Sequence, residues 1–353
     1  MREESRSFLE RLVNTPSPSG FEWPAQEVIR EYLTPYADDI RVDVMGNLIA
    51  TLNPEGKPRV MLAGHCDEIG LMVRFITEEG FVHFSPIGGV DPHLVTGQKV
   101  NIRGRNGAVL GVVGKKAIHL MEADERKKVL DFHQQWIDIG ARNREEAEDR
   151  IAVGDPITFA HEFDQLGGEI AVARSFDDKM GSFVCAEALR LARERRIGAC
   201  LVAVSTVQEE VGARGAATSA FSVQPDVAIA VDVGHATDYP DADKKRVGDT
   251  RLGRGPILHR GANINPVVAE RLFAAAKSAG IGYQMQAMPG RSGTDAWEMQ
   301  IARGGIATAV VSVPLRYMHT PIEVMHLGDI EASAALLAEF AAGLTPDVSF
   351  VPG

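Results

Sequence analysis

The chain has 353 residues, of which 45% are hydrophobic and 24% charged, and its formal net charge is −11. These values predict a globular protein with a large core and enough length for two domains. The negative charge argues against nucleic-acid binding, because nucleic-acid-binding proteins normally present a basic face. No apolar run approaches the roughly 20 residues of a membrane span, and the charged first residues lack the apolar core of a signal peptide.

Three cysteines are present, Cys66, Cys185 and Cys200, and none forms a CxxC pair. An odd number without paired spacing does not suggest a disulfide framework. Reduced thiols and a cytoplasmic location are therefore expected.

The first 70 residues alternate helical and extended patterns. Apolar spacing predicts helices up to residue 13 and over 23–32, and then strands over 40–44, 48–52 and 59–63. The last of these is a short apolar run that leads directly to Gly64 and His65.

The middle of the chain has a different character. From Leu71 to Gly114, short apolar runs are separated by glycine turns, which favours a small β-barrel or sandwich. The charged stretch over 122–150 is expected to be a solvated helix or a mobile loop.

After residue 171 the alternation of helices and strands returns. The pattern predicts helices over 181–193, 267–279 and 332–344, and strands over 200–206, 227–233 and 308–313. Such alternation indicates an α/β/α sandwich with a largely parallel sheet. The β-rich part, residues 71–168, is then an insertion into one catalytic domain made of residues 1–70 and 169–353.

Acidic and histidine residues gather at the ends of the predicted strands, where open α/β sheets form their sites. They are His65 and Asp67, Asp177 and Asp178, Glu209 and Glu210, Asp232, and His319. Imidazole and carboxylate groups of this kind suit zinc, with cobalt or manganese as alternatives. Two ions sharing one carboxylate would suit metal-assisted hydrolysis, with one of two adjacent glutamates as ligand and the other as general base.

Structural interpretations compete for several of these residues. An aspartate before a helix is often only an N-cap, and paired glutamates after a strand can form a solvated turn. His235 and His326 compete with His319 as ligands. Cys66 should point away from His65 and is interpreted as a packed thiol.

Several motifs, in order along nearly the whole chain, resemble the tetrahedral (TET) aminopeptidases, metallo-exopeptidases whose relatives include proteins labelled cellulases. The motifs include NTPSPSGFE, GHCDEIG, SFDDKMG, QEEVGARGA, AVDVGHA, GTDA and YMHTPIE. The resemblance implies that short peptides are cleaved with two metal ions. It also implies that the insertion builds dimers, and that the dimers assemble into a hollow dodecamer.

The resemblance also implies a role for each matching residue. One metal would be held by His65, Asp177 and Asp232, and the other by Asp177, Glu210 and His319. Glu209 would be the general base, and Asp67 would orient His65. Two departures from the family's usual pattern are Cys66 in place of Met and Asp178-Lys179 in place of Asn-Arg.

The substrate pocket is less clearly marked. The segment PGRSGTDAW suggests Arg291, Gly293, Thr294 and Asp295 as substrate-binding residues, with Arg291 either favouring acidic side chains or simply lying in solvent. A deacylase or carboxypeptidase activity is the alternative enzyme class. A glycosidase is disfavoured by the three Trp and five Tyr, and a non-enzymatic scaffold by the intact ligand set.

Overall fold

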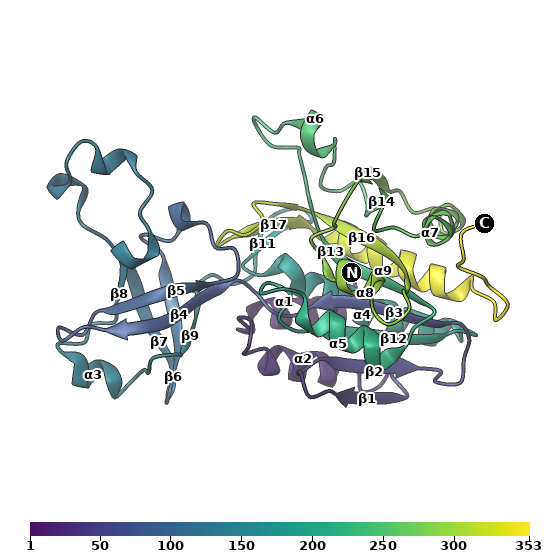
Figure 1. Ribbon diagram of the computed structural model, residues 1–353, viewed down its shortest axis with the longest axis horizontal. Helices are drawn as coiled ribbons and strands as arrows, with labels where there is room; N and C mark the ends of the chain where they lie inside the picture. The colour runs from purple at the N-terminus through teal and green to yellow at the C-terminus, as the bar shows by residue number, and fades with distance from the viewer.

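The computed structural model describes residues 1–353, which form an α/β/α domain and a β-barrel that projects from it (Figure 1). The α/β/α domain is built on an 11-stranded sheet whose main path runs β1-β2-β12-β3-β13-β16-β17-β11-β10, with β14 and β15 continuing from β16. The strands are β1 (Asp39–Val42), β2 (Leu48–Leu52), β3 (Arg59–His65), β10 (Asp164–Gly167), β11 (Ile170–Ala173), β12 (Cys200–Thr206), β13 (Val227–His235), β14 (Ile257–Gly261), β15 (Gln284–Met288), β16 (Ala307–Arg316) and β17 (Glu323–His326).

The four central strands, β12, β3, β13 and β16, are parallel to one another. Their apolar runs are buried on both faces, as expected for parallel strands covered by helices. Because the strands are parallel, their carboxyl ends lie at one edge of the sheet, and this edge collects the polar residues that follow each strand.

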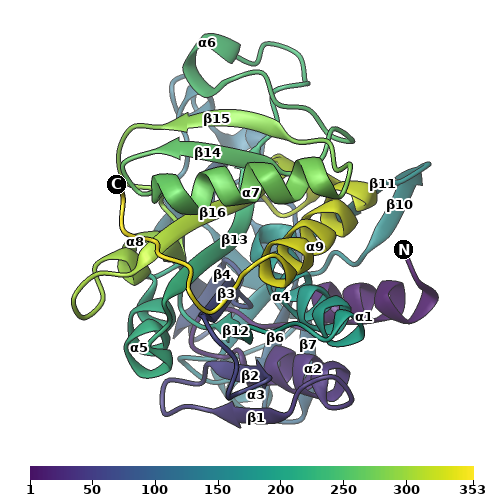
Figure 2. The same ribbon diagram turned by 90° about the vertical axis from the view of Figure 1, so that its right-hand side faces the viewer.

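Helices cover both faces of the sheet. Helices α4 and α9 pack against each other on one face together with α1, α2 and α7, whereas α5 and α8 pack together on the other (Figure 2). The helices of this domain are α1 (Glu3–Asn14), α2 (Trp23–Leu33), α4 (Phe176–Arg195), α5 (Arg214–Val223), α6 (Lys244–Val247), α7 (Pro266–Ser278), α8 (Asp295–Gln300) and α9 (Leu327–Ala342). None of the helices is long and apolar enough to cross a membrane.

The barrel is closed by six antiparallel strands in the order β4-β5-β8-β7-β6-β9 and has a separate core of 16 buried apolar residues. Its elements are β4 (Gly70–Ile76), β5 (Val82–Ile87), β6 (Lys99–Gly104), β7 (Gly107–Gly114), β8 (Trp136–Asp138), β9 (Pro156–Phe159), helix α3 (Arg144–Glu148) and four short 3-10 helices: η1 (Pro92–Leu94), η2 (Ile118–Leu120), η3 (Glu125–Lys127) and η4 (Phe132–Gln134). The predicted α/β/α fold with a β-barrel-like insertion is thus confirmed.

Two details differ from the expectations. The charged stretch over 122–150 is neither one helix nor one loop, because it contributes strand β8 to the barrel. In addition, β10 pairs with β11 in the large sheet, so residues 164–167 belong with the α/β/α domain although the boundary was expected at residue 168. Both segments are short and polar, and their strand character depends on pairing with distant partners, which local patterns do not reveal.

Strand β3 and helix α4 approach each other most closely at Gly64, the residue before His65. A Cβ atom at Gly64 would lie 2.3 Å from the carbonyl carbon of Gly181 and 2.5 Å from the backbone nitrogen of Ser182. The Ser182 hydroxyl donates a hydrogen bond to the Gly64 carbonyl at 2.9 Å. This contact sets the distance between the end of β3 and the start of α4.

We expect Gly64→Ala to destabilise the fold by about 1–3 kcal/mol, because two backbones would have to separate. The thermal midpoint should fall by roughly 2–4 °C for each kcal/mol. Gly198→Ala is the matched control, since a Cβ there meets nothing within 4 Å. Equal midpoints for the two variants, measured by differential scanning calorimetry at one scan rate, would contradict the expectation.

Candidate metal centre and active site

Five side chains with oxygen or nitrogen donors meet at the carboxyl edge of the central strands. His65 ends β3, Asp232 lies on β13, and Asp177 lies at the start of α4, while Glu210 and His319 follow β12 and β16. Their donor atoms form two groups, each with all atoms within 4.8 Å of one another: His65, Asp177 and Asp232, and then Asp177, Glu210 and His319. The structure therefore brings together all five residues that the sequence suggested as ligands.

Asp177 belongs to both groups, and its two oxygens face opposite histidines. Its Oδ1 lies 3.4 Å from Nε2 of His65, and its Oδ2 lies 3.5 Å from Nε2 of His319. The Oε2 atom of Glu210 lies 3.7 Å from the same nitrogen of His319. One carboxylate is thus placed between two sets of donors.

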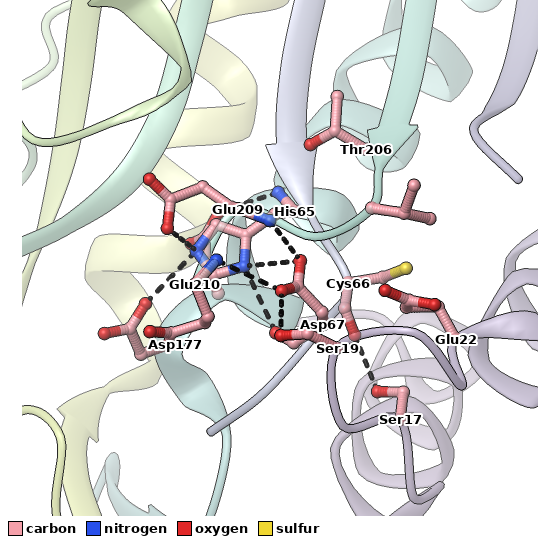
Figure 3. Close-up of polar contacts among 12 residues, drawn as sticks. Ser17, Ser19, Glu22, His65, Cys66, Asp67, Asp177, Thr206, Glu209 and Glu210 are labelled. Carbon is pink, nitrogen blue, oxygen red and sulfur yellow. Dashed lines mark hydrogen bonds and ion pairs between the residues drawn. The ribbon is translucent and has the colours of Figure 1, made fainter. Parts of the chain in front are cut away.

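Asp67 holds His65 in this orientation (Figure 3). Nδ1 of His65 lies 3.1 Å from the Asp67 carbonyl oxygen and 3.4 Å from its Oδ1, which leaves Nε2 facing Asp177. Asp67 is fully buried and also accepts hydrogen bonds from the Ser19 hydroxyl and from the backbone N–H groups of Glu209 and Glu210. A single carboxylate therefore positions both the histidine and the glutamate loop.

His319 is oriented by the barrel. Its Nδ1 lies 3.1 Å from the carbonyl oxygen of Gly89, in the turn after β5. A Cβ atom at Gly89 would lie 2.7 Å from that nitrogen, so a larger residue would push the ring away. The inserted barrel consequently completes the site instead of merely extending the surface.

Glu323, on β17, is a site residue that sequence reasoning did not single out. It is 2% exposed, and its two oxygens accept hydrogen bonds from the backbone N–H groups of Asp177 at 2.9 Å and His319 at 3.3 Å. It fixes two of the suggested ligands without facing the donor groups itself. The sequence did contain a signal for Glu323: it is an acidic residue between two apolar residues, four positions after His319. An acid in such an apolar run is seldom buried without partners.

Other residues that the sequence raised as alternatives or departures lie outside the two donor groups. Asp178 accepts hydrogen bonds from the backbone N–H groups of His65 and Gly181, so it connects the end of β3 to the first turns of α4. Lys179, the other departure from the family pattern, is fully buried and forms ion pairs with Glu68 at 2.7 Å. Cys66 is a buried thiol, and His326 caps α9, so neither belongs to the two donor groups.

The electrostatics of the cluster favour bound cations. Burial, with added repulsion from neighbouring carboxylates, raises the pKa of five carboxyl groups: Asp178, Glu209, Glu210, Asp232 and Glu323. The pKa of His65 is also raised, because its bonds to Asp177 and Asp67 outweigh its burial. So many acids in one buried place are unfavourable unless positive charge neutralises them. The mixture of imidazole and carboxylate donors fits divalent transition-metal ions.

Glu209 differs from its neighbour Glu210. Its side chain lies outside both donor groups, lines the adjacent cavity, and comes within 3.8 Å of Nε2 of His65. Burial raises the pKa of Glu209 to about 8. A carboxyl group beside a donor cluster and open to a cavity can exchange protons with water there.

The cavity next to the cluster has a volume of about 310 Å³. Gly293 and Thr294 line it, together with His235. Asp295 does not; it is buried and accepts a hydrogen bond from the Thr206 hydroxyl at 2.5 Å.

Arg291 does not line the cavity either. It is exposed, and its guanidinium lies over the ring of Trp297 at 5.4 Å from the centroid. Of the two interpretations of Arg291, the structure therefore supports the surface arginine.

Known proteins resemble this chain over most of its length. The family described as M42 glutamyl aminopeptidase matches residues 46–336. The lysyl aminopeptidase of Pyrococcus furiosus is 35% identical, with 98% of this chain and 99% of the relative covered.

Solved structures agree with this match. The TET aminopeptidase of a marine sediment archaeon, Thaumarchaeota archaeon SCGC AB-539-E09, has a TM-score of 0.92 and 35% identity, with 97% of each chain covered. The TET1 peptidase of Pyrococcus horikoshii, described as able to assemble into a tetrahedron or a large octahedral shell, has a TM-score of 0.85 and 31% identity, with 96% of this chain and 100% of that chain covered. Another structure, of PhTET1-12s, contains a dodecamer. From the fold, the donor cluster and these matches, the chain belongs to the M42 peptidase family of TET aminopeptidases and is itself an aminopeptidase.

Proposed function

We propose that this aminopeptidase works with two divalent metal ions shared by Asp177. The observation that carries the proposal is the placement of the two Asp177 oxygens, one toward each histidine. His65, Asp177 and Asp232 would hold one ion, and Asp177, Glu210 and His319 would hold the other. The donor set suits zinc first, with cobalt or manganese as alternatives.

The protein's own groups would carry the proton transfers. Two ions bound in the cluster would polarise the peptide carbonyl and make water more acidic. Glu209 would take a proton from water on a carboxylate oxygen and return it to the leaving amine. Asp67 would keep His65 in place through Nδ1, and Glu323 would keep the backbones of Asp177 and His319 in place. Peptides cleaved at their N-terminal residue are the proposed substrates.

Glu209→Gln tests the proton-transfer role. The amide cannot accept a proton, so kcat should fall by about 10²–10⁴-fold, whereas the two ions should remain bound because Glu209 lies outside both donor groups. Stopped-flow turnover of aminoacyl-p-nitroanilides and metal analysis of the same samples check both parts. Glu55→Gln, at an exposed turn on the opposite edge of the sheet, is the control. Near-normal turnover in Glu209→Gln would exclude Glu209 as the base.

Glu210→Ala tests the division of labour between the two glutamates. The second donor group would lose one of its three members, so we expect about one bound ion for each chain in place of two. Inductively coupled plasma mass spectrometry after dialysis measures this ratio, with Glu55→Ala as the control. Two tightly bound ions in Glu210→Ala would contradict the proposed ligand set.

We also propose that the barrel, as part of the insertion over residues 71–168, mediates dimerisation, and that dimers form a dodecamer. The assemblies described for the similar TET peptidases support this. The short 3-10 helices lie in a long segment that projects from the barrel between β7 and β8 (Figure 1). Two residues of η2 in this segment, Ile118 (57% exposed) and Leu120 (71%), are exposed apolar residues. Exposed apolar residues mark interaction surfaces where they form a contiguous patch. The three unpaired, buried cysteines are consistent with the cytoplasmic location that we propose.

Leu120→Asp tests the barrel surface. We expect the wild type to be a dodecamer and Leu120→Asp to form smaller species, because the variant would place a charge in an apolar contact. Size-exclusion chromatography with light scattering measures the assembly of both proteins. Val44→Asp is the matched control, since Val44 is an equally apolar and fully exposed residue of the α/β/α domain. A monomeric wild type, an intact dodecamer in Leu120→Asp, or equal loss of the dodecamer in both variants would contradict the proposal.

A further inference from the structure

The cavity beside the donor cluster has two chemically different ends. At one end lie Glu209 and two members of the donor cluster, Asp177 and Asp232. The other end lies among strands β14, β15 and β16 and the segment before α8. Its side chains include His259, Gln286, Met288, Ser312 and Met318.

Outside Glu209 and the proposed metal ligands, this cavity lining has no carboxylate, ammonium or guanidinium group. No Lys or Arg lines the cavity, and its carboxylates are those of Glu209 and of the proposed ligands Asp177 and Asp232, the last of which lies beside Ser312 in the sheet. Arg260, the residue after His259, points away and pairs with Glu270 at 2.7 Å on the surface. The far end therefore offers amide, hydroxyl, thioether and imidazole groups only.

His259 is the one polar group at this end that is buried and incompletely bonded. It is 5% exposed on β14, and its Nε2 lies 3.0 Å from the Ser312 hydroxyl on β16. Its Nδ1 is buried and has no hydrogen-bond partner. Burial lowers the pKa of His259 to about 4, so the ring is neutral near pH 7. Such an unpaired nitrogen in a cavity wall is a place for a ligand's polar atom.

We propose that this far end binds the side chain of the substrate's first residue and selects uncharged side chains, with His259 pairing with a polar atom at the tip. The inference rests on the proposed aminopeptidase site, since the scissile bond must lie at the donor cluster. It names His259 as a specificity-determining residue and neutral side chains of Gln or Met length as the preferred class.

Charge is rejected for a physical reason. A Lys ammonium or a Glu carboxylate at the far end would lose its water without gaining a counter-ion, which is costly in a buried place. A Gln amide carries both a donor and an acceptor, so it can pair with Nδ1 in either tautomer of the ring. A Met thioether needs no partner and fits beside Met288 and Met318.

A panel of matched substrates tests the selection on the wild-type, metal-loaded enzyme. The p-nitroanilides of Gln and Glu have nearly the same shape but differ in charge. The p-nitroanilides of Met and Lys have side chains of similar length and also differ in charge. We expect kcat/KM to be about tenfold or more higher for Gln than for Glu, and for Met than for Lys. A no-enzyme blank corrects for cyclisation of the Gln substrate. A preference for Glu or for Lys would overturn the inference.

His259→Leu tests the named residue. The Gln-to-Met ratio of kcat/KM should fall by about tenfold, because the amide loses its partner while the thioether does not. His133→Leu, at an exposed histidine of the barrel, should leave the ratio unchanged. Calorimetric titration with free glutamine and free methionine gives the same comparison without turnover. An unchanged ratio in His259→Leu would overturn the role of His259.

Two further measurements separate the failure modes. His259→Gln keeps a hydrogen-bonding group beside Ser312 and should retain much of the Gln-to-Met ratio of kcat/KM. If this ratio falls as far in His259→Gln as in His259→Leu, a pairing role for His259 is contradicted. If no aminoacyl substrate is hydrolysed while N-acylated or C-terminal substrates are, the proposed function fails. If aminoacyl substrates are hydrolysed with a charged residue preferred, only the specificity inference fails.

Discussion

The arrangement of the site depends on the concentration of negative charge at one edge of a parallel sheet, centred on Asp177. Carboxylates repel one another, and burial makes each of them less stable as an anion. The chain holds them together by giving Asp67, Asp178 and Glu323 two backbone N–H partners each. These three acids are therefore positioning groups, while Asp177, Glu210 and Asp232 keep oxygens available for cations.

The same hydrogen bonds connect segments that are distant in sequence. Asp67 joins β3 to the loop after β12, Asp178 joins α4 to β3, and Glu323 joins β17 to α4. The barrel adds a fourth connection through the Gly89 carbonyl and His319. Each connection ends on a suggested ligand or on its backbone. Loss of one connection should therefore misplace a donor group, and the total effect should be larger than the energy of the lost hydrogen bond alone. The buried Glu68 connects segments in the same way. It forms ion pairs with Arg174, just before α4, and with Lys179, near the start of α4.

Local patterns were sufficient for the parts of the fold that are apolar and continuous. The strand over 200–206 was predicted with the bounds of β12, because every residue of it is buried and its first five residues, Cys200 to Val204, form a continuous apolar run. Strand β8 was missed, because three residues in a charged segment become a strand only by pairing with β5 and β7. In the site, strand ends identified His65, Glu210 and Asp232. Glu323, on β17, was overlooked because its backbone partners, Asp177 and His319, come from other parts of the chain. The two interpretations of Arg291 stayed open because the orientation of a loop side chain is not visible in sequence.

The two ends of the cavity follow from the same topology. Strands β3 and β13 and the loop after β12 bring charged residues to the cluster, whereas β14, which runs antiparallel to β16, contributes His259, whose ring contacts the Ser312 hydroxyl. The peptide bond and the first side chain of a substrate would therefore meet different environments, one charged and one neutral. If the proposed specificity holds, a change at the neutral end would alter which residue is accepted without replacing a donor of the cluster. Within one fold, this separation allows selectivity to vary while the chemistry of hydrolysis stays the same.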